Sequence, residues 1–312
     1  SVPHCRPDGS FEPAISYSLG LTTSTLNSLS FDVRGSGVLA VTAGTVGVAG
    51  GEARIFRSDA DGELELMGVI APALPNRVVA GRVGALNPDD APDLVLQLDA
   101  GTTSPVLTVT AYIGQPGGTF IPTWSLGDAA LGRLGSIDIG TGLDLVTLGS
   151  SGGVAAVTAH LGVGDGTFVT GAASEIATTV GVSICGLSDL DQNYINELVA
   201  VREVPADLWV MRGDGLGTFT TNAKVTLSPG APALAAGAGL LRDFDEGGGP
   251  LNFDAIVPVG LGTPSSSVSV CFNRTYLHGP QLDLGHQLKG TSWPIQVVEG
   301  SFVPGPTPPV WV

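Results

Sequence analysis

A short glycine- and aspartate-rich turn recurs along this chain, and each copy leads into an aromatic residue or a leucine. Five copies are clear, and a sixth around Arg274-Thr275-Tyr276 is degenerate. The clear copies lead into Phe11, Leu64, Phe120, Phe168 and Phe219. Successive copies lie about 50 residues apart, and a period of this length predicts a solenoid, a propeller or an array.

Each repeat contains four short apolar runs, which are clearest at residues 77–83, 93–98, 106–113 and 119–124. The runs are rich in Val, Leu, Ile and Thr and are bounded by Gly, Pro, Asn and Asp, which is typical of β-strands in meander order. The second run is almost continuously apolar, so we expect that strand to be buried on both faces.

A second marker also counts six repeats, because Asp32, Ala85, Asp138, Asp189, Asp243 and Ser301 head six loops between first and second strands. We therefore predict an all-β fold, a six-bladed β-propeller of four-stranded antiparallel blades that forms one domain over residues 1–312. The ends of the chain supply complementary half-blades, which would close the ring. The predicted blades are residues 22–74, 75–126, 127–178, 179–230, 231–288, and 289–312 together with 1–21.

The charge pattern excludes one class of partner. The net charge is −16, and the chain has only two lysines, Lys224 and Lys289, so it lacks the basic surface that nucleic acids require. Only 13% of residues are charged, about half of the usual share. The surface is therefore either rich in Gly, Ala, Ser and Thr or covered by partner proteins. No apolar run is long enough for a transmembrane helix.

Cysteines and histidines give no catalytic or metal-binding spacing. Cys5 and Cys271 occupy matching positions in their repeats and are expected to be small core residues, although a disulfide remains an alternative. His160 lies beside a turn and is expected to be a surface or packing residue. No signal peptide is recognisable at Ser1, so the sequence is either mature or was never exported.

The repeats resemble the FG-GAP/VCBS family, the integrin-α-type β-propellers. The resemblance rests on the second-strand starts Asp93-Leu94-Val95-Leu96, Asp144-Leu145-Val146 and Glu197-Leu198-Val199-Ala200, and on the turn Gly164-Asp165-Gly166-Thr167-Phe168. It implies a propeller in which the loop after the first strand of a blade often binds Ca²⁺.

The strongest calcium candidate is the loop 189–197. Its ligands would be Asp189, Asp191, Asn193 and Glu197, with the backbone carbonyl of Ile195. Alternate side chains of a tight loop can converge on one hard cation, which takes six to eight oxygens. Tyr194 stands where the pattern has glycine, and it would need a positive φ or an altered turn.

Two further loops are candidates for structural Ca²⁺. One contains Asp243, Asp245 and Asp254, although its loop is longer than the pattern. The other contains Asn87, Asp89 and Asp93, but Ala85 has replaced the leading carboxylate. For all of these loops the alternative is a turn in which Asp or Asn hydrogen-bonds to its own backbone.

No nucleophile-and-base pair, phosphate loop or nucleophile elbow is recognisable. The sequence therefore predicts a non-enzymatic, exported propeller, extracellular, periplasmic or at a cell surface, that binds other proteins or serves in a larger complex. A lectin of the same fold is the alternative, since Trp124, Trp209, Trp293 and Trp311 could stack on sugars, although Trp209 lies mid-strand and is expected in the core or a blade interface. A hydrolase with its site on the propeller face is the third hypothesis.

Overall fold

The structure is a computed structural model, and it describes a chain built of β-strands. The described residues are 26–31, 38–43, 51–58, 64–101, 104–138, 140, 142–151, 153–176, 181–191, 193–202, 206–228, 240–242, 254–259, 267–273 and 282–289. Within them, twenty strands form five four-stranded sheets, each an antiparallel meander in chain order.

The five sheets follow one another along the sequence. The first contains β1 (Leu26–Phe31), β2 (Val38–Ala43), β3 (Glu52–Ser58) and β4 (Leu64–Ile70). The second contains β5 (Arg77–Gly84), β6 (Asp93–Asp99), β7 (Leu107–Gly114) and β8 (Phe120–Gly127). The third contains β9 (Ala130–Gly135), β10 (Asp144–Ser151), β11 (Val154–Gly162) and β12 (Phe168–Glu175).

The last two sheets repeat the same order. The fourth contains β13 (Val182–Ser188), β14 (Glu197–Arg202), β15 (Ala206–Gly213) and β16 (Phe219–Ser228). The fifth contains β17 (Leu240–Arg242), β18 (Asp254–Val259), β19 (Ser267–Asn273) and β20 (Leu282–Lys289).

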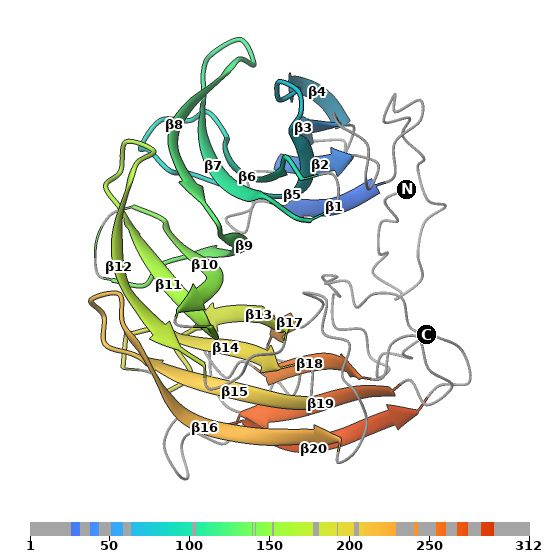
Figure 1. Ribbon diagram of the computed structural model, residues 1–312, viewed down its shortest axis with the longest axis vertical. Coiled ribbons are helices and arrows are strands. Elements are labelled where there is room, and N and C mark those ends of the chain that lie inside the picture. The colour runs from blue at the N-terminus through green and yellow to red at the C-terminus, as the bar shows by residue number, and fades with distance from the viewer. Residues whose placement is uncertain are drawn as a thin grey trace, which may run out of the picture.

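The sheets are arranged around a common centre, with their first strands on the inside and their fourth strands on the outside (Figure 1). This confirms an all-β fold of antiparallel four-stranded sheets. The predicted half-blades at the two ends of the chain lie outside the described residues. The number of six blades and the closure of the ring therefore remain predictions.

The hydrophobic core lies between neighbouring sheets. One cluster joins Ala40, Ala53 and Ile55 of the first sheet to Leu94 and Leu96 of the second. A second cluster joins residues of the second and third sheets, a third joins the third and fourth sheets, and another joins the fourth and fifth. Each described sheet is therefore stabilised by contact with a neighbour, because its apolar residues pack against those of the next sheet.

The second strand of a sheet serves two of these clusters at once. Leu94 of β6 faces the first sheet, while the adjacent Val95 packs against residues of the third. Successive strand residues point to opposite faces, so an uninterrupted apolar strand fills both interfaces. All seven residues of β6 are buried, which confirms the prediction of burial on both faces.

The phenylalanines that follow the turns of the third and fourth sheets pack against the preceding sheet. Phe168 joins the cluster that contains Val109 and Ile113 of the second sheet, and its ring meets that of Trp124 edge-on at 5.0 Å. Phe219 joins the third sheet in the same way, and its backbone N–H donates to Ser174 Oγ at 2.9 Å. The repeated aromatic residue is therefore a contact between sheets.

Hydrogen bonds reinforce the same interfaces. Leu131 N–H donates to Gln97 Oε1 at 2.7 Å, which links the second and third sheets. Thr123 Oγ1 donates to the carbonyl of Gly166 at 2.7 Å. A Cβ atom at Gly166 would lie 2.4 Å from Ile113, so only glycine fits at this close approach, where φ is +84°.

The cysteines that can be described are core residues. Cys271 is fully buried, as predicted, and shares one cluster with Cys185 between the fourth and fifth sheets. Cys5 lies outside the described residues.

The contact between sheets predicts the effect of truncating Phe168. We expect Phe168→Ala to destabilise the protein by about 3 kcal/mol, because it leaves a cavity between the second and third sheets. Val169→Ala is the matched control on the same strand; Val169 is 62% exposed, and its truncation should change stability by less than about 0.5 kcal/mol. Denaturant unfolding measures both, and equal effects would show that Phe168 is not an anchor.

Candidate metal centre

In the second, third and fourth sheets, a buried carboxylate at the start of the second strand fastens the loop that precedes it. In the second sheet, Asp93 Oδ2 accepts hydrogen bonds from Leu86 N–H at 2.6 Å and Asn87 N–H at 3.2 Å. Its other oxygen accepts from Gly114 N–H at 3.0 Å, at the end of β7. Asp93 therefore fixes the loop between β5 and β6 against β7, and both of its oxygens have partners.

Asp144 repeats this arrangement in the third sheet. One oxygen accepts from Ile137 and Asp138, and the other from Gly162 N–H at 2.8 Å. Burial raises the pKa of Asp144, and burial likewise raises that of Asp93 to about 6, while the backbone N–H donors oppose both shifts.

The fourth sheet has glutamate at this position. Glu197 Oε2 accepts from Leu190 N–H at 2.8 Å, which reproduces the bond to the loop. Its other oxygen, Oε1, is buried and has no hydrogen-bond partner within the described part of the chain. The side chain as a whole is 0% exposed. An unpaired carboxylate oxygen in such a place is costly, because it has lost its water without gaining a donor.

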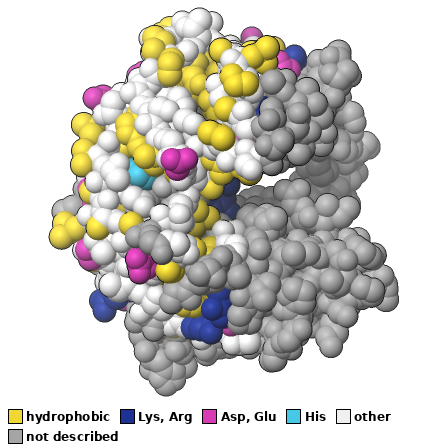
Figure 2. Space-filling view, viewed as in Figure 1, with side chains coloured by type: hydrophobic (Ala, Val, Ile, Leu, Met, Phe, Trp, Pro, Cys, Tyr) yellow, Lys and Arg dark blue, Asp and Glu magenta, His cyan; other side chains and the backbone are white. Residues whose placement is uncertain are grey.

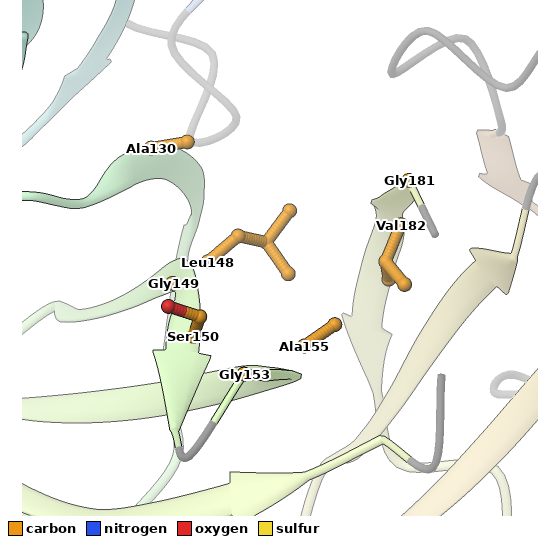
Figure 3. Close-up of a pocket in the computed structure, with 8 residues that line it drawn as sticks. All are labelled: Ala130, Leu148, Gly149, Ser150, Gly153, Ala155, Gly181 and Val182. Carbon is orange, nitrogen blue, oxygen red and sulfur yellow. The ribbon is translucent and has the colours of Figure 1, made fainter. Parts of the chain in front are cut away.

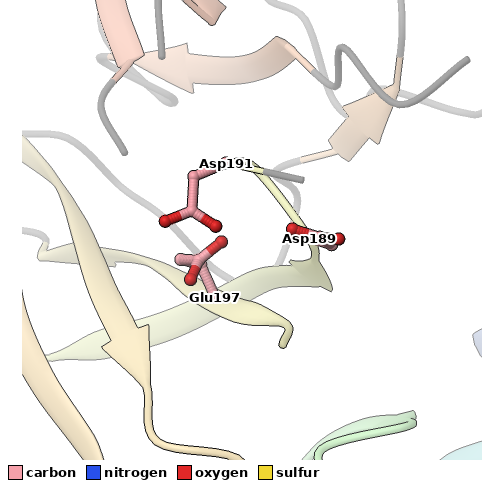
Figure 4. A group of neighbouring side chains, drawn as sticks. All are labelled: Asp189, Asp191 and Glu197. Atoms are coloured by element: carbon pink, nitrogen blue, oxygen red, sulfur yellow. The ribbon is translucent and has the colours of Figure 1, made fainter. Parts of the chain in front are cut away.

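Two more carboxylates lie beside Glu197. One oxygen each from Asp189, Asp191 and Glu197 lies within 4.8 Å of the others, and Figure 4 shows Asp191 and Glu197 facing each other. Asp191 Oδ1 is also buried without a hydrogen-bond partner among the described residues. Three acidic side chains thus converge at one point between β13 and β14.

The electrostatics of this group are unfavourable without a cation. Burial, followed by the charges of Asp191 and Asp189, raises the pKa of Glu197 to about 7, against the hydrogen bond from Leu190. Burial also raises the pKa of Asp191, although Arg212 opposes the shift. A divalent cation would supply the missing charge and the missing partners together.

The backbone of the loop is shaped by side chains of its own. Asp189 accepts hydrogen bonds from Asn193 N–H at 3.0 Å and Tyr194 N–H at 2.8 Å, while Asn193 Oδ1 accepts from Ile195 N–H at 2.7 Å. Tyr194 has a φ of +69°, which confirms that a non-glycine residue here requires the left-handed region. Its side chain is 89% exposed.

The donor set fits a hard divalent cation. Carboxylate oxygens are the ligands that Ca²⁺ prefers, and an oxygen that accepts one N–H still has a lone pair for a metal. The structure therefore brings together Asp189, Asp191 and Glu197 of the predicted set. Asn193 and Ile195 belong to the same loop, and a hydrogen bond links them.

The other predicted calcium loops gain no comparable support. Asn87 and Asp89 hydrogen-bond to each other at 2.8 Å and form a local turn, while Asp93 is occupied by three backbone donors. Asp243 and Asp245 lie outside the described residues, and Asp254 is the first residue of β18. Calcium binding at these two loops stays a prediction.

The structure also contains a pocket of about 330 Å³ between the third and fourth sheets (Figure 3), which the sequence analysis did not predict. Its lining consists of Ala130, Leu148, Gly149, Ser150, Gly153, Ala155, Gly181 and Val182. Small and apolar residues predominate, and the Ser150 hydroxyl is the one polar side-chain group among them. The sequence gives little signal for such a pocket, because alanine and glycine are common throughout the chain.

Comparisons with known proteins identify the fold. No protein-family model matches the chain, and no curated protein matches it. Among solved structures, the periplasmic gluconolactonase PpgL of Pseudomonas aeruginosa is similar, with 16% identity, a TM-score of 0.60, and coverage of 90% of this chain and 76% of that one. A protein from Lactobacillus plantarum is similar with 13% identity, a TM-score of 0.54, and coverage of 83% and 70%.

These comparisons support the β-propeller and correct the predicted function. The sequence analysis predicted a non-enzymatic binding module because no catalytic motif was recognisable. That prediction is contradicted by the likeness to a gluconolactonase, an enzyme built on a similar fold. The reason for the error is physical: function depends on side chains that meet in space, and local motifs do not record them.

The described residues contain no helix that is long and apolar enough to cross a membrane.

His160 is a packing residue. It is fully buried in β11 between Thr147 Oγ1, at 2.9 Å, and Thr170 Oγ1, at 3.0 Å. Its ring also meets Trp124 edge-on at 5.3 Å. Burial lowers the pKa of His160 to about 4, so the imidazole is neutral in the folded protein at pH 7.

This burial predicts a loss of stability in mild acid. The unfolded chain takes up a proton on His160 near pH 6.5, whereas the folded chain does so only near pH 4. The stability that the neutral ring contributes is therefore complete above about pH 6.5 and is lost as the pH falls towards 4, by up to about 3 kcal/mol.

We expect His160→Gln to remove that part of the pH dependence. The measurement is the free energy of unfolding of the wild type and of the variant between pH 7.5 and 4.5. The variant value is subtracted from the wild-type value at each pH, so that the contribution of the carboxylates, which both proteins share, cancels. Parallel curves would show that His160 does not titrate as described.

Proposed function

We propose that this protein is a Ca²⁺-binding β-propeller, with the ion held between β13 and β14 by Asp189, Asp191 and Glu197. The single observation that carries the proposal is the buried Oε1 atom of Glu197, which has no hydrogen-bond partner among the described residues, in a side chain with an oxygen within 4.8 Å of oxygens of two further carboxylates. Asn193 Oδ1 and the carbonyl of Ile195 are the remaining protein ligands that we propose, and water completes the six to eight oxygens that Ca²⁺ takes.

The proposed ion would stabilise an interface as well as a loop. Asn196, next to Glu197, donates from Nδ2 to the carbonyl of Ser136, between β9 and β10 of the third sheet. Fixing the loop 189–197 therefore also fixes its contact with the neighbouring sheet. We also propose that the repeats belong to the FG-GAP/VCBS family, that six blades form a closed ring, and that the protein is exported.

The second candidate function is the hydrolysis of a sugar lactone. It is supported by the likeness to the periplasmic gluconolactonase, which covers 90% of this chain. In this reaction water adds to the carbonyl carbon of the ring ester, the bond to the ring oxygen breaks, and a hydroxy acid is released with one proton. No residue is assigned to the reaction here.

The calcium proposal predicts a metal-dependent melting temperature. We expect excess EGTA to lower the Tm and added Ca²⁺ to restore it, because an ion that binds only the folded state stabilises it by mass action. At a free concentration a hundred times the Kd, the gain is about 2.7 kcal/mol. Differential scanning calorimetry with Ca²⁺, Mg²⁺ and EGTA measures the effect.

Glu197→Gln and Asp144→Asn make a matched pair of variants for this test. Both remove a charge at the same position of a repeat, but only Glu197 belongs to the acidic group. We expect Glu197→Gln to abolish the response to Ca²⁺ and Asp144→Asn to retain it. The proposal is wrong if wild-type Tm is the same in EGTA and in millimolar Ca²⁺.

The lactonase proposal predicts acid release from glucono-δ-lactone above the spontaneous rate. A pH-stat at constant pH measures it, with heat-denatured protein as the control. Assays in Ca²⁺ and in EGTA show whether the ion is needed. A rate equal to that of the denatured control, in both conditions and for lactones of several sugar acids, would exclude this function.

A further inference from the structure

Near the end of each third strand, one residue pairs in register with the residue that follows the phenylalanine or leucine of the turn. In the first to the fourth sheets this residue is Arg57, Ile113, Leu161 and Arg212, respectively. Ile113 is buried between sheets, whereas the side chain of Arg212 is exposed. Charged side chains are few and scattered over the described surface in Figure 2, so a charge at this position is a distinctive feature of the fourth sheet.

The strand register places Arg212 beside Glu197. Leu198 of β14 pairs with Met211 of β15, and the two strands run in opposite directions. The next position along the pair therefore has Glu197 opposite Arg212, where Cβ atoms lie about 4.5–5.5 Å apart. In the third sheet the same two strand ends are close together, since Asp144 accepts a hydrogen bond from the end of β11.

The two side chains also leave the same face of the sheet. Val199 and Val210 lie two residues from Glu197 and Arg212, respectively, and both valines pack in the cluster between the fourth and fifth sheets. Residues two apart on a strand share a face. Arg212 is therefore a neighbour of the acidic group by its place in the sheet.

The charge of Arg212 acts on two of the proposed metal ligands. It opposes the rise in pKa that burial causes at Asp191 and at Glu197. One oxygen of each of these carboxylates is buried and has no hydrogen-bond partner among the described residues. A positive charge opposite Glu197 stabilises the ionised group while no metal is bound. The same charge repels a divalent cation that enters the site.

We propose that Arg212 is the counter-charge of the acidic group in the metal-free protein, and that it sets the affinity of this site for a divalent cation. Arg212 lowers the cost of keeping three carboxylates together without a metal, and it weakens the binding of Ca²⁺ by repulsion. The second role rests on the calcium site proposed above, whereas the first concerns the metal-free protein alone.

The test compares three variants of the whole chain with the wild type. Arg212→Gln removes the charge, Arg212→Lys keeps it, and Arg57→Gln is the matched control. Arg57 is also exposed and occupies the same position in the first sheet, but it lies opposite Val38 instead of a carboxylate. The Tm of each protein is measured in EGTA, and Ca²⁺ is titrated calorimetrically into the metal-free protein, both at low and at high NaCl concentration.

We expect Arg212→Gln to lower the Tm in EGTA by about 2 °C, and Arg57→Gln to lower it less. We expect Arg212→Gln to bind Ca²⁺ about three- to tenfold more tightly than the wild type, because a nearby positive charge is gone. Arg212→Lys should resemble the wild type in both measurements. High NaCl should reduce both effects, because salt screens the charge of an exposed side chain.

Three results would overturn the inference. The first is equal Ca²⁺ affinity of Arg212→Gln and the wild type. The second is a loss of Tm in EGTA that is no greater for Arg212→Gln than for Arg57→Gln. The third is a loss of Tm that is the same at low and at high NaCl, because that would assign Arg212 to packing. If the wild type binds no Ca²⁺, the calcium proposal fails, and the measurements in EGTA alone decide whether Arg212 balances the acidic charges.

Discussion

The burial of apolar surface between sheets is the interaction on which this structure depends. The hydrophobic clusters of the described residues join one sheet to the next, and the second strands contribute side chains to both neighbours. A four-stranded sheet of this kind exposes an apolar face wherever its neighbour is missing. Phe168 and Phe219 add a contact to the preceding sheet in each repeat. Stability is consequently shared along the array, as in other repeat proteins.

In three sheets, a single carboxylate holds the loop between the first and second strands. Replacing aspartate by glutamate at this position creates a candidate metal site. Asp93 and Asp144 use both oxygens to hold backbone N–H groups of their own sheet. Glu197 is one methylene longer and keeps the bond to Leu190, while its second oxygen has no hydrogen-bond partner among the described residues and the side chain faces Asp191. A residue that fastens a loop in two sheets therefore becomes a candidate ligand in a third, without a change in the backbone fold.

The sequence predicts the repeated part of this structure well, because strand period and turn composition are local properties. The strands of the second sheet begin and end within three residues of the runs predicted from sequence, and Tyr194 has the positive φ that its place in the pattern requires. The roles of Asp93 and Glu197 could not be separated in this way. Both match the same motif, and only the donors around each carboxylate distinguish a fastening residue from a candidate ligand.

The acidic group depends on one loop more than on the packing of the array. The acidic group lies in one loop between two strands of one sheet, so its geometry is set by a local turn and by the contact of Asn196 with Ser136. A substitution that loosens the interface between the second and third sheets, such as Phe168→Ala, should therefore lower the stability of the protein while the folded state still binds the cation. Measured together, stability and cation affinity would separate damage to the packing of the sheets from damage to one loop.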